Sequence, residues 1–276
     1  MTDYRSVIKQ EKYTHGHHES VVAAHSARRA IETAAFVLPE LKSPMRLLDF
    51  GCGPGTITID LAEHLLPNGS VLGIDNSKKV ITQARNLAAE LGIENIEFEV
   101  RNIYETGYSS ASFDAVYGHQ VLQHLSDPVK ALKEAWRVLK SGGICGVREV
   151  DWGASAVFPS DQRLCKFFDV YNKVAKRNGG DAFAGRRLKH WFINAGFIDP
   201  TITTSTWTFA EQNALKWWGG QWADRILNSE IGEQAIEYGF ANQQELKEIS
   251  QGWLDWLEAE GAFFAFIQVE AIGMKL

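Results

Sequence analysis

Cysteine is scarce in this chain, which has three cysteines in 276 residues. They stand far apart, at Cys52, Cys145 and Cys165. So few and so scattered thiols exclude both a disulfide framework and a thiolate metal site. We expect three buried, reduced side chains.

Long apolar runs and an excess of positive charge are also missing. No apolar run reaches the roughly 18 residues that a membrane span needs, and residues 1–19 are polar, without the apolar core of a signal peptide. The formal net charge is −6, and no long basic block occurs. Since nucleic acids are bound by clustered Lys and Arg, the charge argues against such a partner. We expect a cytoplasmic protein without a membrane span.

Apolar runs and amphipathic helical patterns alternate over residues 45–150. The expected strands are residues 46–50, 71–75, 96–100, 113–117 and 144–150. The expected helices are residues 56–66, 77–91 and 128–139, the last with Asp127 as its cap and Pro128 at its first position. This alternation predicts a parallel sheet covered on both faces, with its ligand site at the carboxyl ends of the strands.

The C-terminal half has a different pattern. Helices are expected at residues 160–178 and 186–195, a strand at 198–209, about 50 residues of helical pattern at 211–260, and a last strand at 262–274. Such a long connection indicates a helical insertion or lid. Its five tryptophans either pack helices together or form a wall for a flat apolar substrate, and they are Trp217, Trp218, Trp222, Trp253 and Trp256.

These patterns predict an α/β fold, a Rossmann-like, seven-stranded, doubly wound sheet whose final strand is antiparallel. The expected division of the chain has four parts. They are an N-terminal helical lid segment (1–44), a Rossmann-like core (45–209), a helical cap insertion (210–261) and the last strand of the core sheet (262–276).

The strongest motif is LLDFGCGPGT, residues 47–56, a strand followed by a glycine-rich turn and a helix. Glycine is required where the backbone takes positive φ or touches a ligand, and the helix N-terminus offers free N–H groups to an anion. The glycines follow G-x-G-x-G spacing, whereas dinucleotide enzymes usually show G-x-G-x-x-G. Asp49, ahead of the first glycine, suits a ligand that carries an ammonium group.

Two more polar positions follow the next expected strands. Asp75 ends the second strand, where a carboxylate can accept both hydroxyls of a ribose. Asn102 and Ile103 follow the third strand, where an amide next to an apolar side chain can hold an adenine ring. One extended nucleoside can therefore touch the ends of three adjacent strands.

Residues 45–150 resemble the class I S-adenosylmethionine (SAM)-dependent methyltransferases, particularly the ubiquinone/menaquinone-biosynthesis-like (UbiE/COQ5-like) group. The resemblance rests on five pieces in the right order: LLDFGCGPGT, VLGID, RNI, FDAVYGHQVLQHLSDP and RVLKSGG. It implies SAM as cofactor and S-adenosylhomocysteine (SAH) as product, with glycines at the cofactor, Asp75 on the ribose and the pair 102–103 on the adenine. The family often has Asp at position 102. The expected cofactor-binding residues are Tyr13, Asp49, Gly51, Gly53, Gly55, Thr56, Asp75, Asn76, Asn102, Ile103, His119 and Gln120.

The N-terminal segment YTHGHHES, residues 13–20, is unusual for its three histidines. They can bind metal, act as a base or form polar lid surface, and because no Cys or carboxylate partner is evident, no metal site is expected. The candidates for a catalytic base are His17 and Asp151. Asp151 and Glu149 follow the fifth strand towards the expected substrate side, unless they are solvated or paired with an arginine. His124 is expected to be structural.

The function expected from this resemblance is direct, in-line methyl transfer from SAM to a small, partly apolar molecule. Such a reaction needs mainly the alignment of two reactants and the exclusion of water. The alternatives are an NAD(P)-dependent oxidoreductase, a non-catalytic SAM-binding or interaction module, and an aminopropyl transferase. The acceptor atom, the pathway and the oligomeric state cannot be derived from the sequence.

Overall fold

A seven-stranded sheet forms the centre of the computed structural model, which describes Thr14 and residues 28–276. The strand order is β3-β2-β1-β4-β5-β7-β6, and β7 alone runs antiparallel to its neighbours. The strands are β1 (Arg46–Phe50), β2 (Ser70–Asp75), β3 (Ile96–Val100), β4 (Phe113–His119), β5 (Leu139–Phe158), β6 (Thr201–Phe209) and β7 (Phe263–Met274). The predicted fold class, with its antiparallel last strand, is confirmed.

Helices cover both faces of the sheet. They are α2 (Ala30–Thr33), α3 (Thr56–His64), α4 (Lys78–Leu91), α5 (Pro128–Val138) and α7 (Leu188–Ala195). Apolar side chains of α2, α3 and α4 pack on one face, and those of α5 and α7 pack on the other. Because the central strands β1, β2 and β4 are buried on both sides, they appear as apolar runs in the sequence, whereas the outer strands β3 and β6 are partly exposed.

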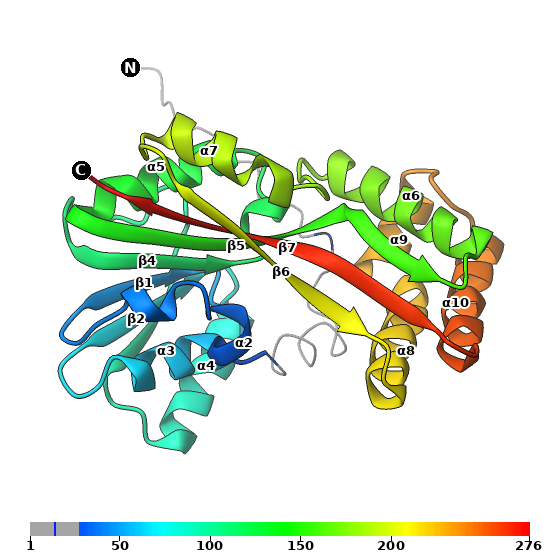
Figure 1. The fold of residues 1–276 in the computed structure, drawn as a ribbon, viewed down its shortest axis with the longest axis horizontal. Helices are drawn as coiled ribbons and strands as arrows, with labels where there is room; N and C mark the ends of the chain where they lie inside the picture. The colour runs from blue at the N-terminus through cyan, green and yellow to red at the C-terminus, as the bar shows by residue number, and fades with distance from the viewer. Residues whose placement is uncertain (1–13, 15–27) are drawn as a thin grey trace, which may run out of the picture.

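Strand β5 is much longer than the expected residues 144–150. Its second half, from Asp151 to Phe158, pairs with β7 through an irregularity between Asp151 and Ala156. Polar and small residues in this half hide the strand pattern, so its extension depends on the partner strand rather than on local sequence. Figure 1 shows β5, β7 and β6 running from the core of the sheet to a separate group of helices.

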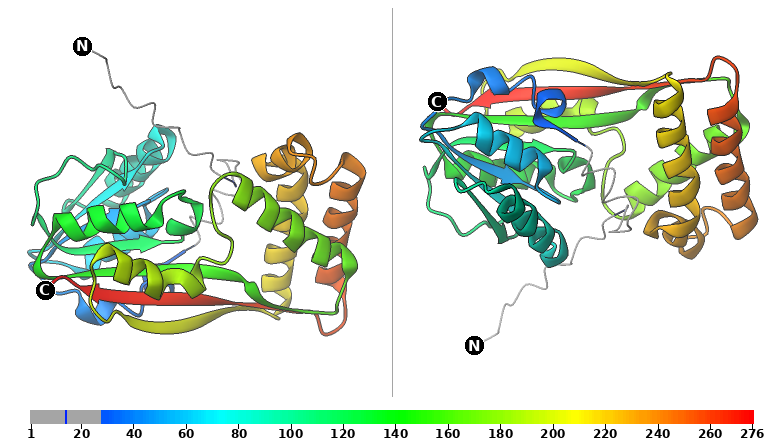
Figure 2. Two further views of the ribbon diagram at one scale, coloured as in Figure 1. Left: turned by 90° about the horizontal axis from the view of Figure 1, so that it is seen from above. Right: turned by 90° about the horizontal axis from the view of Figure 1, so that it is seen from below.

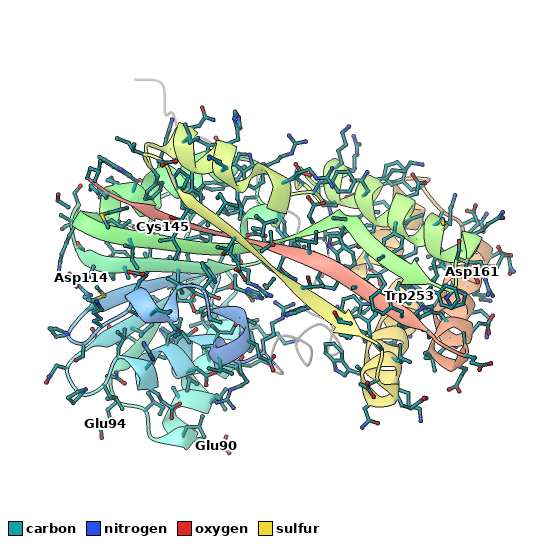
Figure 3. The ribbon with its side chains drawn as sticks, in the orientation of Figure 1. Glu90, Glu94, Asp114, Cys145, Asp161 and Trp253 are labelled. Carbon is teal, nitrogen blue, oxygen red and sulfur yellow. The ribbon has the colours of Figure 1, made fainter. Side chains whose placement is uncertain are left out.

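That group consists of α6 (Gln162–Arg177), α8 (Gln212–Asn228), α9 (Glu230–Glu237) and α10 (Gln243–Glu258). Both views in Figure 2 place these helices at one end of the long strands, away from the glycine-rich half. They share an aromatic core with the outer parts of β5, β6 and β7. Figure 3 marks the separation, with Trp253 on α10 in this group and Cys145 on β5 in the core of the sheet.

The N-terminal segment and the cysteines are described in part and in full, respectively. Residues 28–44, the described part of the expected N-terminal lid, hold α2 and the 3₁₀ helix η1 (Leu38–Glu40), and Ala30, Ala34 and Val37 pack against the sheet. The expectation of three buried thiols is wrong for Cys165, which is exposed because it stands off the apolar stripe of α6; Cys52 and Cys145 are buried. None of the helices in the described part of the chain is both long and apolar enough to cross a bilayer.

Candidate active site

The glycine-rich turn links β1 to α3 through three residues with positive φ. Gly51, Gly53 and Gly55 have φ values of 67°, 54° and 88°. A Cβ at Gly55 would lie 2.9 Å from the Phe98 ring, and one at Gly51 would overlap Val121, so these two glycines are required by packing inside the protein. A Cβ at Gly53 would meet no atom of the described residues within 4 Å. The middle glycine therefore borders open space, as a backbone that approaches a ligand does.

Asp75, at the end of β2, holds this turn in place. One of its oxygens accepts a hydrogen bond from the Gly53 N–H at 3.2 Å, and the other accepts one from the Ser77 N–H at 2.9 Å. A carboxylate at the end of a parallel strand can also accept hydrogen bonds from the hydroxyl groups of a ribose. Asp75 is half-buried and its neighbour Asn76 is exposed. Asp75 thus connects the end of β2 to the glycine-rich turn that follows β1.

Asp49 lies beneath the turn and is 3% exposed. Its Oδ2 accepts a 2.6 Å hydrogen bond from the Thr58 hydroxyl. Burial raises the pKa of Asp49 to about 7; the Thr58 hydrogen bond opposes this shift and the Asp75 charge adds to it. No ion pair among the described residues involves Asp49. A cationic ligand group beside it would favour the ionised carboxylate.

The expected adenine contacts follow β3. The Arg101 N–H donates to the Asp75 carbonyl oxygen at 3.0 Å, which fixes the start of this loop beside the second strand. The Asn102 Oδ1 accepts from the Tyr104 N–H at 2.9 Å, so the amide nitrogen is the group left to face a ligand. Ile103 is half-buried and packs against the core on the α5 side. The glycine-rich turn, Asp75 and Asn102 therefore stand at the ends of three neighbouring strands, β1, β2 and β3.

At the end of β4, His119 is 7% exposed and Gln120 has a φ of 53°. Left-handed backbone is costly for a residue with a Cβ, and such strain concentrates at functional sites. The Gln120 N–H donates to the Arg148 carbonyl at 2.8 Å, and its side-chain amide donates to the Gln268 Oε1 at 3.2 Å. Strands β5 and β7 together hold Gln120 in this conformation.

Glu149 supports the 3₁₀ helix η2 (Leu122–His124) that follows. Its carboxylate accepts hydrogen bonds from the N–H groups of Val121 (2.8 Å), Leu122 (2.6 Å) and Gln123 (3.4 Å). Burial raises the pKa of Glu149 to about 8, although these N–H groups oppose the shift. The expectation that Glu149 faces the substrate is corrected, because its carboxylate is fully buried and directed at backbone.

Asp151 is held in a similar way. Its oxygens accept from Nε and Nη2 of Arg186 at 2.5 and 2.7 Å, and from the N–H groups of Gly153 and Arg186 at 3.0 and 3.2 Å. Of the arrangements considered for this residue, the structure shows the pairing with an arginine. Asp151 therefore fixes the start of η3 (Gly185–Arg187) to the end of the buried part of β5.

A cavity opens between η2 and helix α8. It holds about 490 Å³ of space, part of it continuous with solvent. Its lining comprises Arg28, Gln120, Gln123, His124, Val150, Trp152, Tyr171, Trp207, Trp217, Trp218, Gln221, Trp222, Arg225 and Phe266. Trp217, Trp218 and Trp222 thus form part of a wall, while Trp253 and Trp256 are packed in the core. Because Trp218 and Trp222 also belong to the aromatic core, packing is confirmed for four of the five tryptophans, and a role as a substrate wall stays a prediction.

Several lining residues were missed from the sequence. Trp152, Trp207 and Gln123 come from other strands and loops, so only the folded chain brings them to α8. Trp218 and Gln221, by contrast, lie on one face of α8 at helical spacing, a signal that the sequence did contain. His124, expected to be structural, also lines the cavity. Loss of hydration and the nearby Arg28 charge lower the pKa of His124 to about 3, so its imidazole is neutral at physiological pH.

The cavity and the glycine turn share a wall. Val121 packs on Gly51 of the turn, and the residues on either side of it, Gln120 and Gln123, line the cavity. The segment from 119 to 124 therefore lies between the turn and the cavity and borders both.

The N-terminal expectations fall largely outside the described residues. Tyr13 and the three histidines, including His17, are not among them. Thr14 is 2% exposed, and its hydroxyl accepts a 3.0 Å hydrogen bond from Asn178 at the end of α6. Among Thr14 and residues 28–276, no three His, Cys, Asp or Glu side chains are arranged to hold a metal ion.

Comparison with known proteins agrees with this geometry. The methyltransferase domain family matches residues 41–203. An uncharacterized methyltransferase of Schizosaccharomyces pombe is 31% identical over 262 residues, covering 91% of this chain and 92% of its own. Demethylmenaquinone methyltransferase of Lactococcus lactis is 37% identical over 99 residues, covering 36% of this chain and 39% of its own.

A solved structure shares the fold. Haemonchus contortus phosphoethanolamine N-methyltransferase 2, in complex with phosphomonomethylethanolamine and SAH, aligns with a TM-score of 0.54 at 17% identity. The alignment covers 85% of this chain and 49% of that one, so this chain matches about half of that enzyme. From the family match and the full-length fungal relative together, this chain belongs to the class I SAM-dependent methyltransferases.

Proposed function

We propose that this enzyme methylates a small, partly apolar molecule held in the cavity between η2 and α8. The observation that carries the proposal is the shared wall, in which Val121 packs on Gly51 while Gln120 and Gln123 line the cavity. It brings the expected cofactor turn next to a cavity lined mainly by aromatic side chains, as the sites of small apolar molecules are.

The residues proposed to hold the cofactor are those expected from the sequence. Asp75 at the end of β2 is proposed as the acceptor for the ribose hydroxyls, Gly53 borders space that no described residue fills, and buried Asp49 suits the ammonium group. The Asn102 amide nitrogen and the Ile103 side chain are proposed for the adenine ring, with Asn76 and Thr56 beside the turn and His119 and Gln120 near the methionine part. Tyr13 remains a prediction outside the described residues.

SAM, when bound, supplies a methyl group on a positively charged sulfur, which a nucleophilic atom of the acceptor takes by in-line displacement while the sulfur keeps the bonding electrons. The protein's part is to align the acceptor and exclude water. Glu149 positions η2 and Asp151 positions the turn before α7, and neither is proposed as a base. His124 can accept a hydrogen bond from an acceptor hydroxyl through its neutral ring. His17 remains a prediction.

The subgroup and the cellular location of the protein are also proposals. Membership of the ubiquinone/menaquinone-biosynthesis-like group rests on short matches, such as the 99 residues shared with the Lactococcus lactis enzyme. The cytoplasmic location rests on composition. The family match argues against the oxidoreductase alternative. A non-catalytic SAM-binding module would have the same cofactor site, so only a measurement of turnover distinguishes it from an enzyme.

The test is transfer of a labelled methyl group from SAM to a panel of small hydroxylated aromatics and amines. We expect labelled product and stoichiometric SAH with at least one acceptor, and loss of both with Asp75→Asn. Transfer from SAM with a chiral methyl group should invert its configuration, as in-line displacement requires. Tight SAH binding without turnover on any acceptor would favour the non-catalytic module, and retention of configuration would exclude a single displacement.

A further inference from the structure

The 3₁₀ helix η2 is in close contact with a glycine at each of its ends. At its start, Val121 packs so closely on Gly51 of the glycine-rich turn that a Cβ on this glycine would overlap the valine side chain. At its end, a Cβ on Gly180 would lie only 2.5 Å from the Gln123 carbonyl oxygen. Close packing leaves no room for a methyl group at either contact. The position of η2 therefore depends on two distant segments, the glycine-rich turn and the loop that follows α6.

The contact at Gly180 is with backbone atoms. After the Gln123 oxygen, the atoms nearest to an added Cβ are the His124 Cα at 3.4 Å and the Ala175 carbonyl oxygen at 3.5 Å. A flexible side chain can rotate away from an added methyl group, but a carbonyl oxygen moves only with its peptide. The φ of Gly180 lies outside the left-handed region, so the loop conformation itself does not require glycine. It is the approach to η2 that requires the absence of a side chain.

The helix η2 is held as one rigid element between these two contacts. The buried Glu149 carboxylate accepts the N–H groups of Val121, Leu122 and Gln123. Because three successive peptides are bound to one side chain, a displacement at Gln123 is transmitted to Val121 and from there to Gly51.

The loop 178–182, which contains Gly180, is anchored to the helical group of α6, α8, α9 and α10. The side-chain nitrogen of Asn178 donates to the Gln234 Oε1 on α9 at 2.7 Å and to the Thr14 hydroxyl oxygen at 3.0 Å. Its Oδ1 accepts from the Tyr238 hydroxyl at 2.9 Å. The Asp181 N–H then donates to the Gln123 carbonyl oxygen at 2.8 Å. A short path of hydrogen bonds therefore runs from α9 through this loop to η2.

We propose that the loop 178–182 is a positioning element for cofactor binding, in which Asn178 and Gly180 set the place of η2 against the glycine-rich turn. The inference rests on the proposed cofactor site. It gives the helical group a second role beside lining the cavity, because the group then also determines how tightly the turn binds SAM and SAH. Asn178 and Gly180 are positioning residues, since they act through η2 and not by touching the cofactor.

Gly180→Ala is compared with Gly143→Ala, because both glycines abut backbone. A Cβ at Gly143 would lie 2.9 Å from the carbonyl oxygens of Asp114 and Lys140, where β4 and β5 begin. We expect both variants to lower Tm by about 2–10 °C, since each must displace backbone. Calorimetry should show SAH binding weakened at least about tenfold in Gly180→Ala alone. Equal SAH affinity in the two variants overturns the inference. Failure of SAH to bind the wild type overturns the proposed cofactor site instead, so the two failures are distinguishable.

Val121→Ala tests whether the effect of Gly180→Ala passes through η2. Truncation of Val121 gives η2 room against Gly51, so it should relieve a displacement that comes from the other end of the helix. SAH affinity is measured for both single variants and for the double variant. We expect the double variant to bind SAH at least about threefold more tightly than the product of the two single losses predicts. A loss equal to that product shows that the two positions act independently, and contradicts the inference.

Asn178→Leu tests the anchor of the loop without adding a methyl group beside η2. The control is Asn228→Leu, which changes an exposed asparagine at the end of α8. We expect Asn178→Leu to weaken SAH binding about threefold to tenfold, the range that loss of a positioning hydrogen bond allows. Asn228→Leu should leave SAH binding unchanged. Unchanged SAH binding in Asn178→Leu, whatever its Tm, would restrict Asn178 to the stability of the helical group and overturn its positioning role.

Discussion

Gly53→Ala separates a ligand contact from a backbone requirement, because the chain offers a matched control in Gly92. Both glycines have positive φ, 54° and 68°, and at both an added Cβ meets nothing within 4 Å in the part of the chain that the structure describes. Left-handed backbone costs alanine about 1–2 kcal/mol, and the lower entropy of the unfolded chain returns about 0.4–1 kcal/mol of this. Each variant should therefore lose about 1 kcal/mol, which is about 2–4 °C in Tm.

The two variants should differ only in ligand binding. Gly53 is in the turn at the proposed cofactor site, whereas Gly92 ends α4. A methyl group forced into a close contact costs about 1–3 kcal/mol, a factor of about 5–150 in Kd. Thermal melting and calorimetry with SAH measure both quantities. We expect equal Tm shifts and weaker SAH binding in Gly53→Ala alone. Undiminished SAH binding in Gly53→Ala would refute the reasoning that the open space at this glycine is where the cofactor lies.

Three further predictions concern titratable groups. The pKa of Glu149 is raised in the folded state to about 8 from 4.5, so the stability it contributes is complete at low pH and is lost as pH rises through this window, by on the order of 5 kcal/mol. Glu149→Gln, whose Oε1 can keep two N–H partners, should flatten a curve of Tm against pH, and an unchanged slope would contradict this. Because the pKa of Asp49 is about 7, a ligand ammonium group should bind more tightly as pH rises through about 7. Calorimetry should show the affinity for SAH rising over this pH range, and Asp49→Asn should remove the increase. A wild-type affinity that does not change with pH would count against a contact between Asp49 and the ammonium group. A thiol reagent should modify exposed Cys165 in the native protein. It should modify Cys52 and Cys145 only after unfolding, because these two thiols are buried and burial raises the pKa of each. Fast reaction of all three cysteines would show that the fold is more open than described.

The sequence predicted most elements of the glycine-rich half because their patterns are local. Strands β1 and β3 begin and end where the apolar runs do, and the Asp127 side chain caps α5 as expected by accepting from the Lys130 N–H. Gly51, Gly53 and Gly55 could be read from spacing, since a turn between a strand and a helix depends on neighbouring residues.

The parts that could not be predicted depend on distant pairing. The second half of β5 is a strand only because β7 lies beside it, and Asp151 is engaged because the chain returns with Arg186 35 residues later. The cavity joins Trp152 of β5 to Trp218 of α8, which no local pattern connects. Cys165 is a different case, because its place off the apolar stripe of α6 was visible in the sequence.

The most direct test of the cofactor site is calorimetry of the purified protein with SAH, beside NADH, for the wild type and for Asp75→Asn. The two N–H groups of Gly53 and Ser77 donate to different oxygens of Asp75, so the variant keeps an acceptor for one of them and loses the negative charge. We predict micromolar binding of SAH, no binding of NADH, and SAH binding weakened at least about tenfold in the variant. Binding of NADH in preference to SAH, or equal SAH affinity in Asp75→Asn, would contradict the account of how this turn recognises its ligand.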